Sequence, residues 1–390
     1  MIPASAASSL HKAKWALLVG NFAIGTGVMA TAGTLNDLAK SLDVSTAVAG
    51  QLIAIAAVVM AFGAPLLAGW VSGFDRRRLL MCCLLWYAVG HAACALMPTY
   101  VTLWPVRALT VLAAAVFTPQ AAAAIGFMSP TAQRGSSIAF IFLGWSVASV
   151  AGIPLSAWLG ETQGWRAAFW VVAAVSALAA GLVFWALPNG VKPAAVSLRA
   201  WKGVFTHPVL MAMVGVTALQ AAGQFTLFSY FAPYYKQVLG VSPGQLTLLF
   251  LWFGAFGLLG NLLLARFIDR LGIHKAVFIT LGLVALSLLM WPLATSVLAT
   301  AVLLVPWGLG CFSANSAQQA RLGTAAPALA SALLALNSSA MYLGQAIGAS
   351  GGGWLLSHGG FGPLSWLSLV GVVAAMALSV WVARKAVVVA

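Results

Sequence analysis

Acid–base chemistry in this chain rests on very few side chains, because only five of its 390 residues are acidic. The four cysteines (Cys82, Cys83, Cys94 and Cys311) fall within apolar runs, at spacings that match no zinc site. No glycine-rich loop is followed by the lysine of a nucleotide-binding motif. The sequence therefore predicts no enzyme site, no metal centre, no bound cofactor and no ATP-driven pump. The acidic residues are Asp37, Asp43, Asp75, Glu161 and Asp269.

Arg107 and His91 lie within apolar segments, where a charged side chain is costly enough to indicate function. Arg107 is the only basic residue that we expect well inside a helix, and no acidic residue lies at its depth. Carbonyl groups and water, Asp37 near the end of the first helix, or an anionic substrate could balance its charge. Asp37 and His91 are the candidates for carrying a proton. A packing role is the alternative for both Arg107 and His91.

Membrane-spanning helices must position these side chains. The chain is 62% hydrophobic and 6% charged, whereas a soluble domain carries about 25% charged residues. It contains twelve apolar segments of roughly the 20 residues that a helix needs to cross a bilayer. The sequence therefore predicts an all-α integral membrane protein. The segments lie near 15–35, 46–70, 79–97, 101–127, 136–160, 166–187, 208–231, 245–265, 276–294, 297–320, 328–356 and 362–383.

The net charge of +14 comes from basic residues in short loops rather than from one basic face, so no nucleic-acid partner is expected. With twelve spans, Lys40, Arg166 and Lys236 lie on the side away from the termini, and Arg107 lies within a helix. The other fifteen of the nineteen Lys and Arg residues lie on the side of the termini. By the positive-inside rule, both termini face the cytoplasm of a bacterial inner membrane.

The two halves of the chain repeat each other at a nearly constant offset. The pattern Leu42-x-Val44-Ser45 recurs 197 residues later as Leu239-x-Val241-Ser242, and Gly152 corresponds to Gly348. Parallel six-helix repeats are a transporter architecture. We therefore predict two pseudo-symmetric six-helix bundles. The expected parts are a cytoplasmic N-terminus (1–14), an N-terminal bundle (15–187), a cytoplasmic central loop (188–207), a C-terminal bundle (208–383) and a cytoplasmic C-terminus (384–390).

Several motifs make the chain resemble the major facilitator superfamily, and within it the twelve-helix drug:H⁺ antiporters. The run from Asp269 to Lys275 (DRLGIHK) is similar to the family's D-R-x-G-R-R loop. The first-half copy departs from it, with Ser72 at the Asp position and Asp75 at the Gly position. The helix that contains Gly152 and Pro154 resembles the glycine- and proline-rich signature of exporters, and Arg107 resembles the family's intramembrane arginine.

The resemblance implies which residues gate the pathway and which bind solute. The loops after the second and eighth helices would clamp the cytoplasmic side, and the glycine–proline helix would flex. Polar residues on cavity-lining helices would hydrogen-bond the solute, although some of them serve packing instead. The expected gating residues are Asp75, Arg76, Arg77, Gly152, Pro154, Asp269, Arg270 and Gly272. The expected substrate-binding residues are Asn21, Thr26, Arg107, Gln120, Gln220, Gln224, Tyr230, Trp307, Asn315 and Tyr342.

The function implied is secondary active efflux of a small polar or amphiphilic solute, such as a sugar, nucleoside or drug, by alternating access. Protons are the candidate coupling ion, and the protein is expected to act as a monomer in the lipid bilayer. An uptake or facilitated-diffusion carrier of the same fold is the alternative, with an anionic solute paired to Arg107. A membrane-embedded sensor or enzyme would need catalytic groups or an attached domain, and the sequence offers neither.

Overall fold

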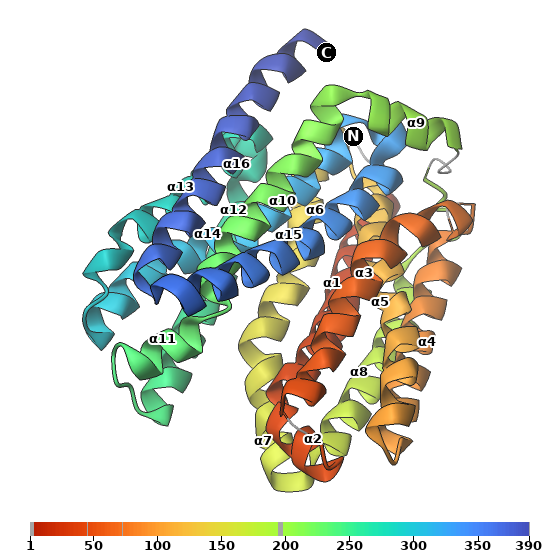
Figure 1. Cartoon of the computed structure of the whole chain (residues 1–390). Coiled ribbons are helices and arrows are strands. Elements are labelled where there is room, and N and C mark those ends of the chain that lie inside the picture. The colour runs from red at the N-terminus through yellow and green to blue at the C-terminus, as the bar shows by residue number, and fades with distance from the viewer. Residues whose placement is uncertain (1–3, 45, 72, 194–197, 390) are drawn as a thin grey trace.

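The computed structural model describes residues 4–44, 46–71, 73–193 and 198–389, and in these ranges the chain is helical with no strand. Ser72, the residue at the Asp position of the first loop motif, lies outside the described residues. The first and last described residues lie at the same end of the bundle, which we call the terminal side (Figure 1). The other end is called the opposite side.

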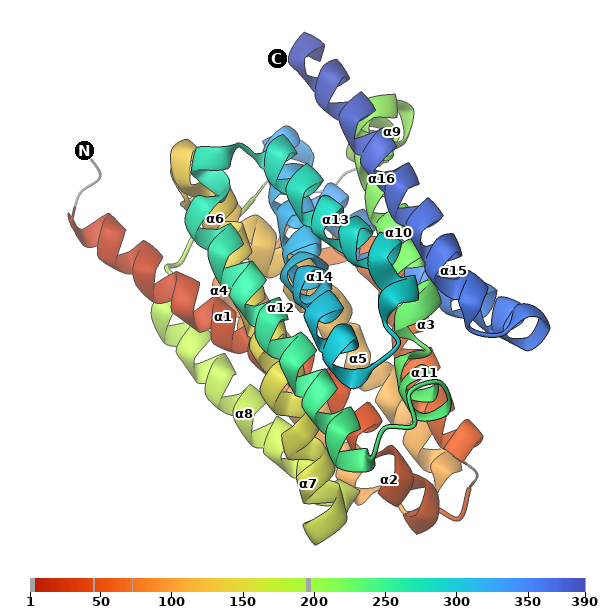
Figure 2. The ribbon, with the colours of Figure 1, turned by 90° about the vertical axis from the view of Figure 1, so that its left-hand side faces the viewer.

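The first half contains six membrane-crossing elements and one additional short α-helix, α2 (Figures 1 and 2). The fifth crossing is interrupted: α6 leads through a π-helical segment, Ala148–Gly152, into α7. The helices are α1 (Ala4–Gly33), α2 (Leu35–Ser41), α3 (Thr46–Val71), α4 (Arg76–Leu96), α5 (Tyr100–Met128), α6 (Arg134–Val147), α7 (Ile153–Gln163) and α8 (Trp165–Ala186).

The second half repeats the first almost element by element. The short helices α2 and α11 begin at residues 35 and 231, and the long helices α5 and α14 begin at residues 100 and 297. The expected central loop 188–207 contains one short helix, α9 (Leu198–Thr206). The remaining helices are α10 (Pro208–Phe228), α11 (Phe231–Gln237), α12 (Pro243–Leu271), α13 (Ile273–Met290), α14 (Val297–Ala325), α15 (Ala330–Gly359) and α16 (Gly362–Val389).

Eleven helical segments of the described chain are long and apolar enough to cross a membrane. The remaining predicted span, 328–356, forms the 30-residue helix α15. Its Gly, Ser, Asn and Gln residues lower its hydropathy, but at about 1.5 Å per residue it is long enough to cross the bilayer. The predicted fold of two pseudo-symmetric six-helix bundles is confirmed.

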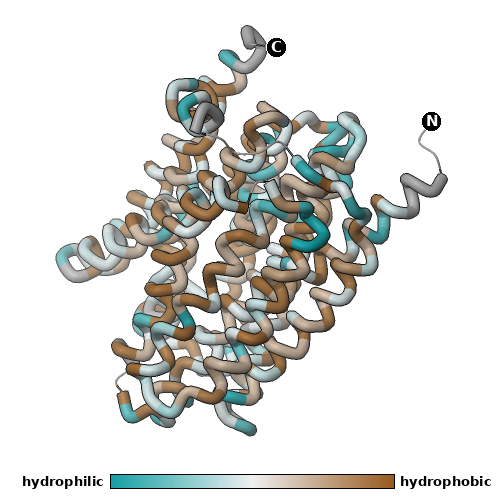
Figure 3. Tube along the Cα trace, turned by 90° about the vertical axis from the view of Figure 1, so that its right-hand side faces the viewer, coloured by the Kyte–Doolittle hydropathy of each residue, from teal (hydrophilic) through white to brown (hydrophobic). Residues whose placement is uncertain are grey.

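The chain is mostly apolar around the middle of the bundle, and its polar residues gather towards the ends (Figure 3). Large side chains point outwards from the crossing helices, among them Trp70 at 83% exposure, Leu298 at 76% and Trp185 at 68%. In water such a surface would be a large hydrophobic patch. Against lipid it is the surface that a membrane protein requires, and the backbone polar groups beneath it are paired within helices.

Small residues let the helices of each half approach closely, at equivalent positions. A Cβ atom on Gly152 would lie 3.2 Å from Oγ1 of Thr26 on α1. A Cβ atom on Gly348, the equivalent residue, would collide with the carbonyl oxygen of Ala222 on α10. Glycine at both positions therefore sets the distance between the first and fifth membrane-crossing helices of each half.

The two halves meet along three surfaces. Helix α3 packs against α15, α6 packs against α12 and α14, and α5 packs against α15. The interface therefore runs through the centre of the molecule. Its contacts are related by the repeat, because α12 is the equivalent of α3, and α15 is the equivalent of α6 and α7.

Candidate functional site

On the terminal side, Asp269 joins the two halves through a hydrogen bond. Its Oδ1 atom accepts from the backbone N–H of Ser136, at a distance of 3.2 Å. Ser136 lies in the first turn of α6, where backbone N–H groups lack helical partners and the helix dipole favours a negative charge. Gly272, with φ +81°, ends α12 two residues after Arg270, which is exposed. Asp269 is thus held at the end of one half and bonded to the start of a helix in the other.

The glycine at position 135 leaves room for this contact. A Cβ atom on Gly135 would lie 3.0 Å from Oδ1 of Asp269, which is tighter than ordinary van der Waals contact. Nearby, a Cβ atom on Gly323 would lie 2.8 Å from Cδ1 of Ile138 on α6. The start of α6 is therefore packed closely against the ends of α12 and α14.

The corresponding loop of the first half bonds within its own half. Asp75 caps α4 by accepting from the backbone N–H groups of Arg77 and Arg78, and its other oxygen accepts from the N–H of Gly190 at 2.5 Å. Arg77 donates to Oδ1 of Asn189 at 3.1 Å, and buried Arg76 donates to the carbonyl of Phe74 at 2.7 Å. In this conformation Asp75, Arg77 and the backbone N–H of Arg76, which donates to the carbonyl of Val191 at 3.0 Å, tie α4 to the segment after α8. The hydrogen bonds of Asp75 to described residues stay within the first half, whereas that of Asp269 crosses to the other half.

The π-helical segment before Pro154 contacts α1 of its own half and α12 of the other half. Proline has no N–H with which to bond the carbonyl four residues earlier, so the helix widens there. The segment contacts α1 on one side through Gly152 and Thr26. On the other side, a Cβ atom on Gly254 of α12 would lie 3.0 Å from Cγ2 of Val150. Gly152 and Pro154 thus belong to an irregular stretch between the two halves.

Arg107 is fully buried and bound by neutral groups. One guanidinium nitrogen lies 2.9 Å from Nε2 of His91, and another donates to the carbonyl of Gly27 at 2.8 Å. Since arginine can only donate, Nε2 of His91 must accept. Its Nδ1, which lies 2.9 Å from the carbonyl of Tyr87, therefore carries the hydrogen. His91 is a neutral imidazole that links α4 to Arg107 on α5.

Asp37 does not pair with Arg107. It lies on the short helix α2, and its Oδ2 accepts from the backbone N–H of Trp165 at 2.6 Å. Trp165 is the first residue of α8, so the carboxylate caps the N-terminus of that helix, at the end of the bundle called the opposite side. The pair that the sequence indicated as one option is therefore not formed in this conformation.

Several expected substrate-binding residues carry buried polar atoms that have no hydrogen-bond partner among the described residues. Gln220 is fully buried on α10, and both its amide nitrogen and its amide oxygen lack a partner. Gln224 lies one turn further along the same helix and is also buried. Polar groups in this state are costly unless something else bonds them. The other atoms of this kind are Oγ1 of Thr26, Nε of Arg107, Oε1 of Gln120, Nε1 of Trp307 and Oδ1 of Asn315.

Other polar residues on the same helices hold each half together. Asn21 on α1 accepts from Thr118 on α5 and donates to the carbonyl of Ile141 on α6. An equivalent network joins the corresponding helices α10, α14 and α15 of the second half. There, Thr217 donates to Asn337 and accepts from Gln318.

Two expected substrate residues also make packing contacts. The hydroxyl of Tyr230 donates to the carbonyl of Ala349 at 2.6 Å, beneath the glycines of α15. Trp307 packs edge to face on Phe231, with ring centroids 4.9 Å apart, and lies in an aromatic cluster with Trp291.

Comparisons with known proteins agree with the architecture. The family model described as "Major Facilitator Superfamily" matches residues 17–349. The chain belongs to the major facilitator superfamily. It is 31% identical over 349 residues to the "Inner membrane transport protein YdhP" of Escherichia coli (strain K12), which covers 88% of both chains. It is 26% identical over 366 residues to the "Uncharacterized MFS-type transporter YbcL" of Bacillus subtilis (strain 168), which covers 93% of both.

Two solved structures of this superfamily share the fold at low identity. The proton:xylose symporter XylE superposes with a TM-score of 0.75 at 17% identity, over 95% of both chains. The human organic anion transporter MFSD10 (TETRAN) superposes with a TM-score of 0.79 at 16% identity, over 97% of this chain and 100% of the other. The protein is therefore a multi-pass membrane transporter of the major facilitator superfamily.

Sequence reasoning missed three features of this major facilitator protein. It placed Arg321 in a loop, whereas the residue lies in α14 at 1% exposure and donates to Oγ of Ser379 at 2.8 Å. Arg107 is thus not the only basic residue inside a helix, because α14 continues to Ala325. Asn261 on α12 also donates to Ser146 on α6 across the interface, at 2.9 Å. Tyr342 on α15 lies close enough to Tyr87 of the first half to interact electrostatically.

Proposed function

We propose that this transporter is an efflux permease that exports a small, uncharged polar or amphiphilic solute by alternating access, as a monomer. The observation that carries export is the π-helical segment with Pro154, which packs on α1 and faces α12. An irregular element between the halves can change shape when they rock, and a glycine–proline helix here is the feature that resembles exporters.

The terminal side is assigned to the cytoplasm. Fifteen basic residues assigned to this side against three on the other support the orientation, and the Escherichia coli relative is called an inner membrane protein. In this orientation the Asp269–Ser136 bond closes the cytoplasmic side. Asp269, Gly272 and the start of α6 then act as the latch that must open before solute can enter from the cell.

The solute is expected at mid-membrane, between the halves. We assign Gln220 and Gln224 from the second half and Thr26 and Gln120 from the first to this site, because all four are buried. The unbonded amide and hydroxyl atoms of Gln220, Gln120 and Thr26 would gain partners from a polar solute. A neutral solute fits best, because both terminal nitrogens of the Arg107 guanidinium are already bonded, one to His91 and one to the Gly27 carbonyl.

We assign proton coupling to His91. Its Nε2 lone pair accepts from Arg107, so protonation of that atom would remove the acceptor and place two positive charges 2.9 Å apart. The other groups around it are Tyr87 on α4, the Gly27 carbonyl on α1 and the ring of Phe169 on α8. With no carboxylate among these neighbours, the protonated pair would have to separate, which moves α4 relative to α5.

A proton-coupled exporter is tested with inverted membrane vesicles. A melting-temperature screen of sugars, nucleosides and amphiphilic drugs on the purified protein first identifies a ligand, because ligands that bind the folded state raise its stability. Inverted vesicles energised by a pH gradient, acidic inside, should then accumulate that ligand, and collapse of the gradient should stop accumulation. Accumulation that proceeds by counterflow alone, unaffected by the gradient, would identify the facilitated-diffusion carrier instead.

A further inference from the structure

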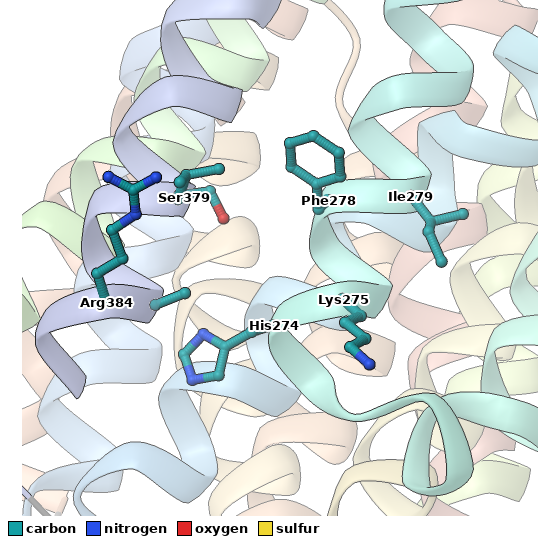
Figure 4. Close-up of a pocket in the computed structure, with 8 residues that line it drawn as sticks. His274, Lys275, Phe278, Ile279, Ser379 and Arg384 are labelled. Atoms are coloured by element: carbon teal, nitrogen blue, oxygen red, sulfur yellow. The ribbon is translucent and has the colours of Figure 1, made fainter. Parts of the chain in front are cut away.

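A groove on the outer surface of the second half combines an apolar wall with basic side chains. It encloses about 540 Å³ between α13 and α16, near the terminal end of both helices. In Figure 4, His274 projects from α13 towards α16, and Arg384 lies on the facing helix. The residues that line the groove are His274, Lys275, Phe278, Ile279, Ser379, Val380, Ala383 and Arg384.

The groove faces the lipid rather than the interface between the halves. Helices α13 and α16 pack on each other and on other helices of the second half. Phe278 is 43% exposed and Ile279 is 46% exposed, so the wall of the groove offers apolar surface to the bilayer. Lys275 lies at the start of α13 and Arg384 lies near the end of α16, so both mark the level at which the membrane meets water.

The positive charge around the groove is not balanced by protein groups. Among the described residues, neither Lys275 nor Arg384 has a carboxylate partner. Behind the groove, Arg321 donates through one nitrogen to Ser379, while its Nε and Nη2 atoms have no partner. Nδ1 of His274 is buried and also lacks a partner.

The acidic residue of the adjoining cavity is already engaged. Asp269 lines the adjoining cavity together with His274 and Arg321, and its Oδ1 atom accepts from Ser136 of the other half. An anion is therefore the missing partner of this surface. A phosphate group supplies several strong acceptors for lysine and arginine.

We propose that the groove between α13 and α16 binds an anionic phospholipid of the membrane leaflet on the terminal side. The headgroup phosphate contacts Lys275, Arg384 and His274, and an acyl chain lies along Phe278, Ile279 and Val380. Basic pockets between membrane helices are suited to anionic headgroups, and each nearby Lys or Arg contributes about fivefold in affinity. This proposal requires only that α13 and α16 cross the membrane. It does not depend on which solute the protein transports or in which direction.

The test uses the full-length purified protein in a neutral detergent. Phosphatidylglycerol, phosphatidylcholine and inorganic phosphate are titrated separately, with melting temperature and native mass spectrometry as readouts. We expect phosphatidylglycerol to be retained and to raise the melting temperature at concentrations about tenfold below those at which phosphatidylcholine acts. Inorganic phosphate alone should have no effect.

Charge-removal variants locate the site. Removal of the two groove charges in Lys275→Gln/Arg384→Gln should weaken the phosphatidylglycerol effect roughly 30-fold. The control Arg266→Gln/Lys385→Gln removes an equal number of positive charges from the terminal end of the second half, but outside the groove. It should behave like the parent protein. Equal responses to both lipids, an equal response to inorganic phosphate, or an unchanged lipid response in Lys275→Gln/Arg384→Gln would each overturn the proposal.

Discussion

The carboxylate of Asp269 and the backbone N–H of Ser136 form a 3.2 Å hydrogen bond between the two halves of the molecule. It joins the end of α12 to the first turn of α6. A negative charge at a helix N-terminus contributes typically about 0.3–1 kcal/mol, and up to ~2 kcal/mol where it is partly buried. A bond of this strength can bias one conformation of a transporter and still break during each cycle.

Replacement of Asp269 by Asn should favour opening of the terminal side. The amide retains an acceptor oxygen but loses the charge that interacts with the helix dipole, so we expect transport to fall about three- to tenfold with unchanged expression. Ser136→Ala is the matched control, because it keeps the backbone N–H that makes the bond and should transport normally. Full transport by Asp269→Asn in proteoliposomes would remove the latch from the mechanism.

His91→Gln should separate proton coupling from solute binding. Glutamine can accept a hydrogen bond from Arg107 but cannot take up a proton. We expect the variant to exchange solute by counterflow but to lose accumulation driven by a pH gradient. A His91→Gln protein that still concentrates solute from the gradient would show that the proton is carried elsewhere.

Asp37→Ala should affect stability before it affects coupling. Its carboxylate caps α8 at the N–H of Trp165, and loss of a cap costs roughly 0.5–2 kcal/mol. The melting temperature should therefore fall by a few degrees, while gradient-driven transport per folded molecule persists. Loss of gradient-driven transport with an unchanged melting temperature would instead make Asp37 the proton carrier.

Gln220→Leu should weaken solute binding without unfolding the protein. Its amide has no partner among the described residues, so an apolar side chain of similar size leaves no protein group unbonded. We expect affinity for the screened ligand to fall about five- to thirtyfold with little change in melting temperature. Gln318→Leu is the contrasting variant, since it breaks bonds to Met213 and Thr217 and should melt earlier. Unchanged affinity in Gln220→Leu would exclude the residue from the site.

Glycine substitutions on α15 should have opposite effects at nearby positions. Alanine at Gly348 collides with the carbonyl of Ala222, a backbone atom that cannot easily move, so the cost should be about 1–3 kcal/mol. Alanine at Gly351 meets nothing within 4 Å and should gain up to about 1 kcal/mol of helix propensity. Melting temperatures of the two variants check this, and equal values would contradict the close packing of α10 and α15.

The sequence alone predicted the fold because the bilayer imposes long apolar helices, and because the duplication left glycines at equivalent places. Gly152 and Gly348 were recognised as a pair from their spacing, and each packs on the first helix of its half. The expectation for Asp269 rested on a motif, and the structure adds its partner, Ser136.

Contacts between distant segments could not be read from the sequence. The bond between His91 and Arg107 joins two helices, and nothing in either segment specifies which faces meet. Arg321 was assigned to a loop because a hydropathy boundary does not reveal that α14 continues to Ala325 and that Ser379 meets the guanidinium. The two loop motifs look related in sequence, yet Asp75 bonds within its half and Asp269 bonds across the interface.

The central claim, that the halves rock about a central site and that Asp269 holds the terminal side closed, is tested most directly by distances between spin labels. In a cysteine-free background, one pair is placed at Ala132 and Ala328 on the terminal side. A second pair is placed at Ser41 and Gln237 on the opposite side, and all four residues are exposed. Introduction of Asp269→Asn should lengthen the first distance and shorten the second. Distances that remain unchanged, or that lengthen on both sides together, would contradict the account.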